Sequence, residues 1–369
     1  GNNTSTGKNK NITVVGSRVE DGKLHSLSYE EINNIRKNYD FVLIEGDGAK
    51  EKLLKEWNDY EPCIPKFSTK IIGVINMDIN DLHLCEKNIH RFELLKEKFP
   101  DNINKKITSD FLSKYILSAD YFKNSNINSE KYLFFNGIDG KNYLSKFQNT
   151  LRIVYKLYEN NFLPKIVMGS IHEKNIFSLK KLDAVIMASG FSKRMGKNKL
   201  SLTYNGRTIL ESTLEKIFHI PFNKVIICGR EKWIEELASK YNFEYCYNSF
   251  ADLGQSESIK LGIENSTGEG IVFFPGDQPL LSENTILNLY YEFQKTNLIT
   301  VPTVEEKRFS PVFFPEDKKG ELLKLEGDIG GKSVIKKTPI INLVKFSSEK
   351  EFKDIDTIED YMYIINNKK

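Results

Sequence analysis

Short apolar runs with the character of β-strands alternate with amphipathic segments through almost the whole chain. In its second half the apolar runs are DAVIMA at residues 183–188, KVIICG at 224–229, FEYCYN at 243–248, GIVFFPGD at 270–277 and LITVPT at 298–303. Segments with helical periodicity separate them. Parallel strands need such long crossover connections, whereas antiparallel strands need only a short turn. The alternation therefore predicts an α/β fold with open, mostly parallel sheets.

The alternation occurs twice, and 369 residues are more than one core usually holds, so two domains are expected. In the first half the expected strands are NITVVG (11–16), DFVLIEGDG (40–48), KIIGVINMD (70–78), KYLFFNGIDG (131–140) and PKIVMGSI (164–171), with helices at 28–39 and 143–160. A polar, lysine-rich stretch follows them. We predict one α/β domain over residues 1–172, a linker at 173–180, and a second α/β domain over residues 181–369.

Composition excludes several classes of protein. The chain is 40% hydrophobic and 28% charged, and its net charge of +3 is too small for nonspecific nucleic-acid binding. No apolar stretch reaches the roughly 18 residues of a membrane span. The cysteines are far apart and form no CxxC pair, so neither a disulfide framework nor a zinc site is expected, and a reducing cytoplasm fits best. These are Cys63, Cys85, Cys228 and Cys246.

The stretch VIMASGFSKRMGKNK, residues 185–199, runs from an apolar strand into a glycine-containing cationic loop. Gly190 and Gly196 allow backbone N–H groups to turn inward, and such an array of amides cradles phosphate oxygens. Arg194 and Lys199 add a planar fork and a point charge. Neither GxGxxG nor GxxxxGK[ST] occurs, and the alternative is a solvated surface loop with incidental lysines. Its place after the first strand of an α/β domain favours an anion site.

Asp277 follows the run IVFF, so its carboxylate is expected at the carboxyl end of a strand. Mg²⁺ binds through one or two carboxylates together with phosphate oxygens and water, and Asp277 suits that role. The alternative is a turn residue, because Gly-Asp before proline is good turn chemistry. The cationic loop nearby favours the metal ligand.

Several ordered segments resemble one family. MASGFSKRMGKNKL (187–200) resembles the signature loop, AAGxSxRMGxxK, of nucleotidyltransferases with a Rossmann-like fold, and most closely that of the MocA-like molybdenum cofactor cytidylyltransferases. LTYNGRTILESTLEKI, GQSESIKLGI, FFPGDQPLL, RFSPVFF, LLKLEGDIGGKSVI and DIDTIEDY follow in the family's order. The resemblance covers about residues 180–369. It implies transfer of CMP from CTP to the terminal phosphate of molybdopterin, with Mg²⁺ and release of pyrophosphate.

The resemblance also implies roles for individual residues. Arg194, Lys199 and Asp277 would be catalytic, and Asp277 and Asp356 would hold the metal, although Asp356 equally suits a helix cap. The nucleotide would contact Ala188, Ser189, Gly190, Arg194, Lys199, Gln255, Ser256 and Ser258. The last three stand at a helix start, where capping is the competing role. Guanylyltransferases usually carry two adjacent glycines where this chain has Ser189-Gly190, so CTP is favoured over GTP.

Other readings of the second half stay open. A transferase of the same fold that uses GTP, or a sugar or polyol phosphate acceptor, would carry the same loop. A molybdenum cofactor carrier that no longer turns over nucleotide belongs to a different functional class. The expected partners are CTP, molybdopterin and, as a further candidate, a molybdenum hydroxylase apoenzyme, with no nucleic acid and no membrane.

The first half resembles the YqeC family of accessory proteins for selenium-dependent molybdenum hydroxylases over about residues 11–172. The resemblance rests on EGDGAKEKLLK…EPCIP, VVGSRVEDGKLHSLS, NIHRFELL and ITSDFL, while FFNGIDG looks like a degraded NKxD motif. It implies a maturation role and a candidate site of Glu45, Asp47, Lys50, Asn136 and Asp139; His90 and Arg91 are ligand contacts or structural residues. Family members usually begin with a glycine-rich phosphate loop, which this sequence lacks. Either that segment lies outside the given residues, or this half cannot hold a triphosphate in the usual way. NTP hydrolysis is therefore not predicted for this half.

Overall fold

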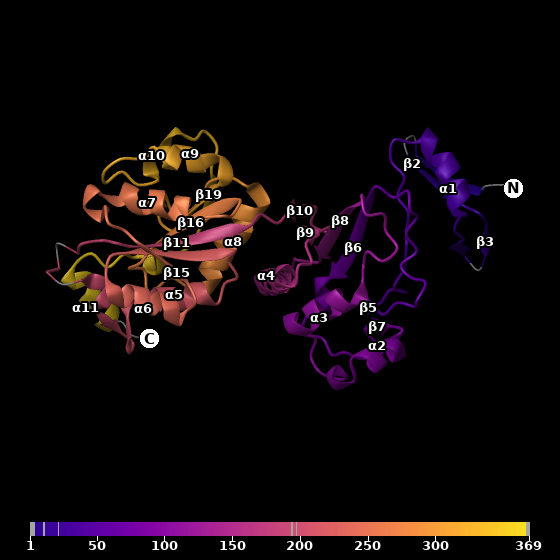
Figure 1. The fold of residues 1–369 in the computed structure, drawn as a ribbon, viewed down its shortest axis with the longest axis horizontal. Helices are drawn as coiled ribbons and strands as arrows, with labels where there is room; N and C mark the ends of the chain where they lie inside the picture. Colours follow the sequence, from indigo (N-terminus) through magenta and orange to yellow (C-terminus); the bar gives the residue numbers. More distant parts are fainter. Residues whose placement is uncertain (1–3, 10–11, 21, 193–194, 197, 367–369) are drawn as a thin grey trace. The chain divides into compact units, whose positions relative to one another are not determined.

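The computed structural model describes residues 4–9, 12–20, 22–192, 195–196 and 198–366, and they gather into two compact units. The first unit comprises residues 1–73, 83–105 and 118–132, and the second comprises residues 74–82, 106–117 and 133–369. Figure 1 labels their helices and strands. Short 3₁₀ helices lie at residues 36–38, 77–79, 100–102, 199–201, 251–253, 316–318 and 350–352.

The first unit is built from short elements. Strands β1 (Thr4–Asn9) and β2 (Ile12–Gly16) pair antiparallel, as do β3 (Val19–Glu20) and β4 (Lys23–Leu24). Helix α1 (Tyr29–Ile35) begins at a capping box in which Ser28 and Glu31 satisfy each other's backbone N–H groups. Strands β5 (Leu54–Lys55) and β7 (Ile89–His90) pair parallel, and helix α2 (Phe92–Lys98) follows.

The strand expected at residues 40–48 does not form. Residues 41–49 have no regular secondary structure, and Phe41 and Leu43 are 88% and 95% exposed. Although this run has a strand-like apolar pattern, a strand is stable only beside hydrogen-bonded neighbours, and the described chain supplies none for it. The prediction of a strand at this position was wrong.

A four-stranded sheet has the order β10-β9-β8-β6. Its strands are β6 (Lys70–Asn76), β8 (Glu130–Asn136), β9 (Lys165–Ser170) and β10 (Asn175–Ser178), and β6 and β8 each run from the first unit into the second. Helix α4 (Tyr143–Glu159) belongs to the second unit, as does α3 (Ser109–Ala119) up to Leu117. Strand β10 lies inside the segment expected to be a linker, because residues 175–178 pair antiparallel with β9.

The main sheet has eight strands in the order β15-β14-β11-β16-β19-β17-β18, with β20 paired to β17. Their bounds are β11 (Leu182–Ala188), β14 (Lys224–Gly229), β15 (Glu244–Tyr247), β16 (Gly270–Pro275), β17 (Thr300–Val304), β18 (Lys307–Arg308), β19 (Val312–Pro315) and β20 (Asn342–Lys345). The pairs β11–β14, β11–β16, β14–β15 and β17–β20 are parallel, and the pairs made by β19 and β18 are antiparallel. The predicted α/β class is confirmed.

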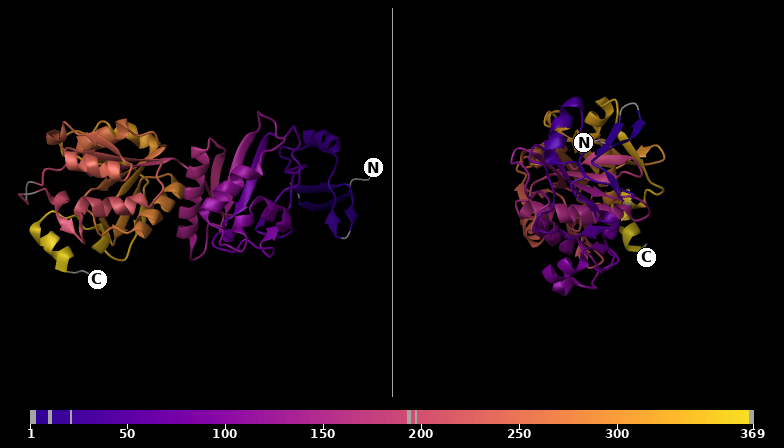
Figure 2. Two further views of the ribbon diagram at one scale, coloured as in Figure 1. Left: turned by 60° about the horizontal axis from the view of Figure 1, so that its bottom comes forward. Right: turned by 90° about the vertical axis from the view of Figure 1, so that its right-hand side faces the viewer.

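Helices cover both faces of this sheet (Figures 1 and 2). On one face lie α7 (Gln255–Glu264), α9 (Lys319–Leu322) and α10 (Lys332–Lys337), and on the other lie α5 (Ile209–Phe218), α6 (Lys232–Lys240) and α11 (Ile358–Asn366). Helix α8 (Glu283–Thr296) follows β16, and β12 (Thr203–Tyr204) pairs with β13 (Arg207–Thr208). Buried Val185, Ile226 and Ile271 of the strands pack with Ile259 of α7 and Leu322 of α9. This apolar layer fixes the strand ends that carry the polar residues described below.

Among the described residues, none of the helices combines the length and apolar character needed to cross a membrane.

Candidate functional site

The strand order reverses between β11 and β16. From β11 the chain builds outward through β14 to β15, and then returns to place β16 on the opposite side of β11. At such a reversal the loops leave the sheet in opposite directions and open a crevice at the carboxyl ends of the strands. Ala188 ends β11 and Asp277 follows β16 closely, and the Gly276 N–H donates to Met187 O at 3.2 Å. The two predicted motifs therefore meet at the carboxyl ends of the adjacent parallel strands β11 and β16.

Lys199 lies between two carboxylates at these strand ends. Its ammonium pairs with Asp277 Oδ2 and donates to Asp356 Oδ1 at 2.8 Å. The side chains of Asp277 and Lys199 are 9% and 16% exposed, whereas that of Asp356 is 52% exposed. Three residues predicted from separate motifs thus converge on one point.

The charges of this cluster perturb one another. Burial raises the pKa of Asp277, the Lys199 ammonium opposes that rise, and Asp356 adds to it. Burial also works to lower the pKa of Lys199, but hydrogen bonds and Coulomb attraction from the two carboxylates outweigh it, so that pKa is raised. The folded protein therefore holds Lys199 as a cation, which compensates for a buried carboxylate.

A third carboxylate, Asp354, adjoins the cluster and escaped the sequence analysis. Gln278 Nε2 donates to Asp354 Oδ1 at 2.9 Å and to Phe352 O at 3.1 Å, and the Ile355 N–H donates to Asp277 O at 3.2 Å. These bonds tie residues 352–356 to the end of β16. Burial, followed by the negative charge of Asp277, raises the pKa of Asp354 to about 7. The DxD spacing of Asp354 and Asp356 was the signal in the sequence.

The loop after β11 is held from the side of β14. Ser189 is buried, and its hydroxyl donates to Cys228 O at 2.9 Å. Arg230 Nε donates to Ser189 O at 2.9 Å, and Asn248 Nδ2 donates to Ser189 Oγ at 3.2 Å. Gly190 is exposed, with open space around the position a Cβ would take. Predicted Arg194 lies outside the described residues.

The predicted polar residues at the start of α7 have structural partners. Ser256 and Ser258 are buried; the Ser258 hydroxyl accepts from Asn248 Nδ2 at 3.0 Å, and the Ser256 N–H donates to Gly327 O at 3.1 Å. The Gln255 N–H donates to Asp328 Oδ1 at 3.3 Å. The N-cap residue of α7 is Gly254, which has no side chain to cap the helix. The capping role considered for the three polar residues is therefore absent.

In the first unit, one of the predicted site residues joins a buried ionic network. Lys55 Nζ pairs with Asp47 Oδ1, donates to Gly48 O at 3.0 Å and lies 3.5 Å from Glu61 Oε1. Arg91 forms a bidentate ion pair with Glu61: its Nη1 donates to Oε2, and its Nη2 donates to Oε1 at 2.7 Å. The hydrogen bonds from Arg91 are the largest of the effects that lower the pKa of Glu61 to about 2.

Glu45, Lys50 and His90 are three further titratable residues of the first unit. Glu45 and Lys50 are exposed. Burial, followed by the positive charges of Arg91, Lys50 and Lys55, lowers the pKa of His90. One oxygen of Asp47, Oδ2, is buried without a hydrogen-bond partner. Residues 47–53 form neither a helix nor a strand, so these ion pairs and hydrogen bonds hold the segment in place.

Asn136 and Asp139 lie at the end of β8, in the second unit. The Ile171 N–H donates to Asn136 Oδ1 at 3.1 Å, and the Ser170 hydroxyl donates to Asp139 Oδ2. Lys146 Nζ lies 3.8 Å from Asp139 Oδ1. The five residues predicted as one N-terminal site therefore fall in two compact units, with Glu45, Asp47 and Lys50 in the first.

Two family models match this sequence. The MobA-like NTP transferase domain matches residues 184–342, and the YqeC protein family matches residues 2–93. The chain joins a YqeC domain to a MobA-like NTP transferase domain. The matches confirm the resemblance to YqeC within residues 2–93 and the resemblance to Rossmann-like nucleotidyltransferases in the second half, whereas the cytidylyltransferase branch stays a prediction.

Individual relatives match parts of the chain. A probable molybdenum cofactor guanylyltransferase of Methanosarcina mazei is 29% identical over 37% of this chain and 63% of its own length. The protein of the same name from Methanosarcina acetivorans is 29% identical over 48% of this chain and 82% of its own length. The protein YqeC of Escherichia coli is 32% identical over 20% of this chain and 30% of its own length. The chain thus spans less than two thirds of the first and third of these relatives.

The donor set of the transferase domain fits a hard divalent cation. Within residues 4–366, apart from the few that are not described, no three His, Cys, Asp or Glu side chains gather into a metal site. Mg²⁺ does not require three, because it binds one or two carboxylates and takes phosphate oxygens and water for the rest. Asp277 and Asp356 provide two carboxylates, and the Lys199 ammonium between them marks a place that favours positive charge.

Proposed function

We propose that the transferase domain moves CMP from CTP to the terminal phosphate of molybdopterin and releases pyrophosphate. The observation that carries this proposal is the pairing of Lys199 with Asp277 and Asp356 at the strand-order reversal of a MobA-like NTP transferase domain. Support for the molybdopterin acceptor comes from the names of the Methanosarcina relatives and from the YqeC domain in the same chain.

In this reaction an oxygen of the acceptor phosphate forms a bond to the α-phosphorus of CTP. The bond from that phosphorus to the bridging oxygen of the β-phosphate breaks, and pyrophosphate leaves with the electron pair. The protein need not form a covalent bond itself, because positioning and charge neutralisation lower the barrier. Lys199, and Arg194 as carried over from the family motif, would neutralise the triphosphate and the leaving pyrophosphate. Backbone N–H groups of Ser189 and Gly190 would contact the nucleotide.

Asp277 and Asp356 would hold Mg²⁺, which when bound neutralises charge on the phosphate oxygens. Lys199 would then leave the two carboxylates and turn its ammonium toward the phosphates. Gln278 and Asp354 would keep Asp277 and Asp356 at the correct separation, since they tie residues 352–356 to the end of β16.

GTP is the second candidate nucleotide. The Ala188-Ser189-Gly190 form of the loop favours CTP, whereas both Methanosarcina relatives carry the name guanylyltransferase. The two readings differ only in the base that is recognised.

For the YqeC domain we propose a role in maturing a selenium-dependent molybdenum hydroxylase, in the cytoplasm, with the hydroxylase apoenzyme as partner. The fusion supports this role, because a domain that finishes a cofactor and a domain that serves its target enzyme would act in succession. Asp47 and the network around Lys55 would form the scaffold of its site.

The experiment is pyrophosphate release from CTP, GTP and ATP, each with Mg²⁺ and with or without molybdopterin. Wild type is compared with Asp277→Asn, which keeps the shape of the side chain and removes its charge. Asp317→Asn, a change at an exposed carboxylate, is the matched control. Release that requires molybdopterin, prefers CTP and disappears in Asp277→Asn supports the proposal. Release with GTP supports the second candidate, and retained pterin binding without any release supports a carrier instead.

A further inference from the structure

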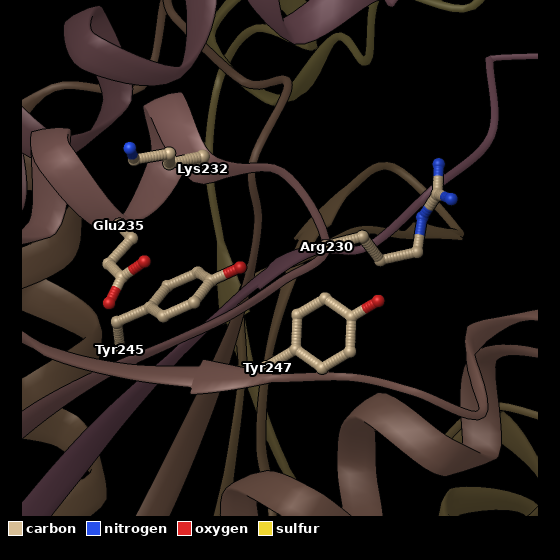
Figure 3. A pocket seen from close by; sticks show the side chains of 5 residues that line it. All are labelled: Arg230, Lys232, Glu235, Tyr245 and Tyr247. Atoms are coloured by element: carbon tan, nitrogen blue, oxygen red, sulfur yellow. The ribbon is translucent and has the colours of Figure 1, made fainter.

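A hollow of about 550 Å³ opens at the carboxyl ends of β14 and β15. It is lined by Arg230, Lys232, Glu235, Tyr245 and Tyr247 (Figure 3). The two tyrosines come from β15, Lys232 and Glu235 come from the first turn of α6, and Arg230 follows β14. Two phenol rings and two cations give this hollow the chemistry of a site for a flat, polar ring.

Arg230 connects this hollow to the loop after β11. Its Nε donates to Ser189 O at 2.9 Å, and its guanidinium carbon lies 3.8 Å from the centroid of the Phe191 ring. One hydrogen bond and one stacking contact therefore orient the plane of the guanidinium. In the described part of the chain, neither of its terminal amino groups has a hydrogen-bond partner. Two parallel N–H donors are thus held ready beside the hollow.

We infer that Arg230 reads the base of the nucleotide, an inference that rests on the proposed nucleotidyl transfer. A guanidinium fork pairs with two adjacent acceptors and cannot pair with a donor. Cytosine offers O2 with N3, and guanine offers O6 with N7. Adenine sets an amino group beside N7, and uracil sets an N–H between its two carbonyls. Arg230 therefore selects cytosine or guanine against adenine and uracil.

The tyrosines supply a surface for the face of the base. Tyr247 is 63% exposed, so a large part of its ring surface is available for stacking on a base. Stacking on an aromatic ring stabilises any base and carries little sequence preference. The choice among bases therefore depends on the edge that meets Arg230, while Tyr247 contributes to affinity for all four.

The alternative role for Arg230 is to bind a phosphate group, and it predicts a different effect of mutation. Arg230 and Lys232 together could hold a phosphate by charge, in which case any change to Arg230 would weaken all nucleotides alike. Arg230→Lys separates the two uses, because it keeps a cation and removes the parallel pair of donors. Arg207→Lys is the matched control, because Arg207 is half-exposed and its partner is Glu215 at 3.4 Å.

The experiment measures the affinity of the whole chain for CTP, GTP, ATP and UTP with Mg²⁺ by equilibrium dialysis. We expect wild type and Arg207→Lys to bind CTP or GTP about 10- to 100-fold more tightly than ATP and UTP. Arg230→Lys should reduce that preference to about twofold while its affinity for ATP stays nearly unchanged. An analogue that lacks one acceptor should bind wild type and Arg230→Lys equally: 3-deazacytidine triphosphate if CTP is preferred, or 7-deazaguanosine triphosphate if GTP is preferred.

Two results would overturn the inference alone: a preference that survives in Arg230→Lys, or an equal loss for all four nucleotides. Wild type that binds none of the four would overturn the proposed function together with it. Selective binding that depends on Arg230 but leads to no pyrophosphate release would reject only the transferase reaction and leave Arg230 as the base reader of a carrier.

Discussion

Replacing Lys199 with methionine tests the charge balance among Lys199, Asp277 and Asp356. The methionine keeps an apolar stem of similar length and removes the ammonium that lies between Asp277 and Asp356. Asp277 is then left as a buried carboxylate without a counter-ion. We expect a less stable transferase domain, with a loss that depends on pH.

The size of the loss follows from burial. Removing one partner of a buried ion pair costs about 3–5 kcal/mol, whereas an exposed pair contributes about 1 kcal/mol or less. The Asp277 side chain is 9% exposed and that of Asp356 is 52% exposed, so the pair with Asp277 dominates. We therefore expect Lys199→Met to lower the free energy of unfolding by about 3 kcal/mol near neutral pH.

The pH dependence has a definite sign. Burial already raises the pKa of Asp277 above its ordinary value of 3.8, and loss of Lys199 raises it further. A carboxyl group whose pKa is raised by folding penalises the folded state as pH rises through the interval between the unfolded and folded pKa values. The deficit of Lys199→Met should therefore be largest at neutral pH and shrink as the pH falls toward about 4.

Fluorescence can follow this domain by itself. The chain has two tryptophans, Trp57 and Trp233, and Trp233 lies on α6 beside the main sheet. In a Trp57→Phe background, urea unfolding reports the transferase domain alone. Lys336→Met, an exposed lysine of α10, should change stability by less than about 0.5 kcal/mol.

Adding Asp277→Asn to Lys199→Met should restore most of the lost stability, because it removes the unpaired charge. A Lys199→Met variant that is as stable as the lysine control, or that Asp277→Asn destabilises further, would show that Lys199 does not compensate the charge of Asp277.

Three further predictions concern the two domains. Glu61→Gln should lower the free energy of unfolding by about 3 kcal/mol at neutral pH, because the pKa of Glu61 falls from 4.5 to about 2 on folding. The difference in stability from wild type should vanish as the pH falls from about 4.5 toward 2. Trp57 fluorescence in a Trp233→Phe background measures it. Asp183→Ala should lower the free energy of unfolding by about 3 kcal/mol or more, because this fully buried carboxylate accepts hydrogen bonds from the N–H groups of Thr267 and Gly268 at 2.5 and 2.6 Å. Asp183→Asn should lower it less, as measured by urea unfolding in the Trp57→Phe background. Gly254→Ala should weaken CTP binding by at least about 10-fold, because Gly254 has φ +117° and a Cβ there would lie 2.3 Å from the carbonyl carbon of Gly327. Gly206 is the control, because it has φ +79° and open space around the Cβ position. Gly206→Ala should leave the affinities measured by dialysis unchanged and lower the free energy of unfolding by about 1 kcal/mol.

The sequence pattern predicted the transferase domain well because its strands are buried and bounded by clear turns. DAVIMA, KVIICG and GIVFFPGD all form strands of the main sheet, within a residue or two of the expected bounds. Apart from charged residues at its ends, each run is apolar on both faces, as a central parallel strand requires. Local chemistry therefore sufficed to place these elements.

Local chemistry failed where pairing decides the outcome. DFVLIEGDG has the pattern of a strand, yet residues 41–49 remain irregular because a strand needs a neighbour. Residues 175–178 read as a polar linker, yet they pair with β9. In both cases the deciding interaction lies outside the segment itself.

The candidate site shows the same division. The motifs indicated Lys199, Asp277 and Asp356 one by one, but not that the lysine would stand between the two carboxylates. Asp354 and Arg230 were missed because their neighbours, Gln278 and Ser189, are far away in the sequence. Only the strand order brings those neighbours within hydrogen-bond distance.

The position of Lys199 has a consequence for the order in which ligands bind. A divalent cation that arrives alone must compete with a resident ammonium for both carboxylates. A nucleotide offers that ammonium a new set of anionic partners, so phosphate binding and metal binding assist each other. In the proposed transferase, Lys199 therefore acts as an intramolecular competitor that disfavours metal without nucleotide. The metal should bind strongly only as its nucleotide complex, and its apparent affinity should rise when CTP is present.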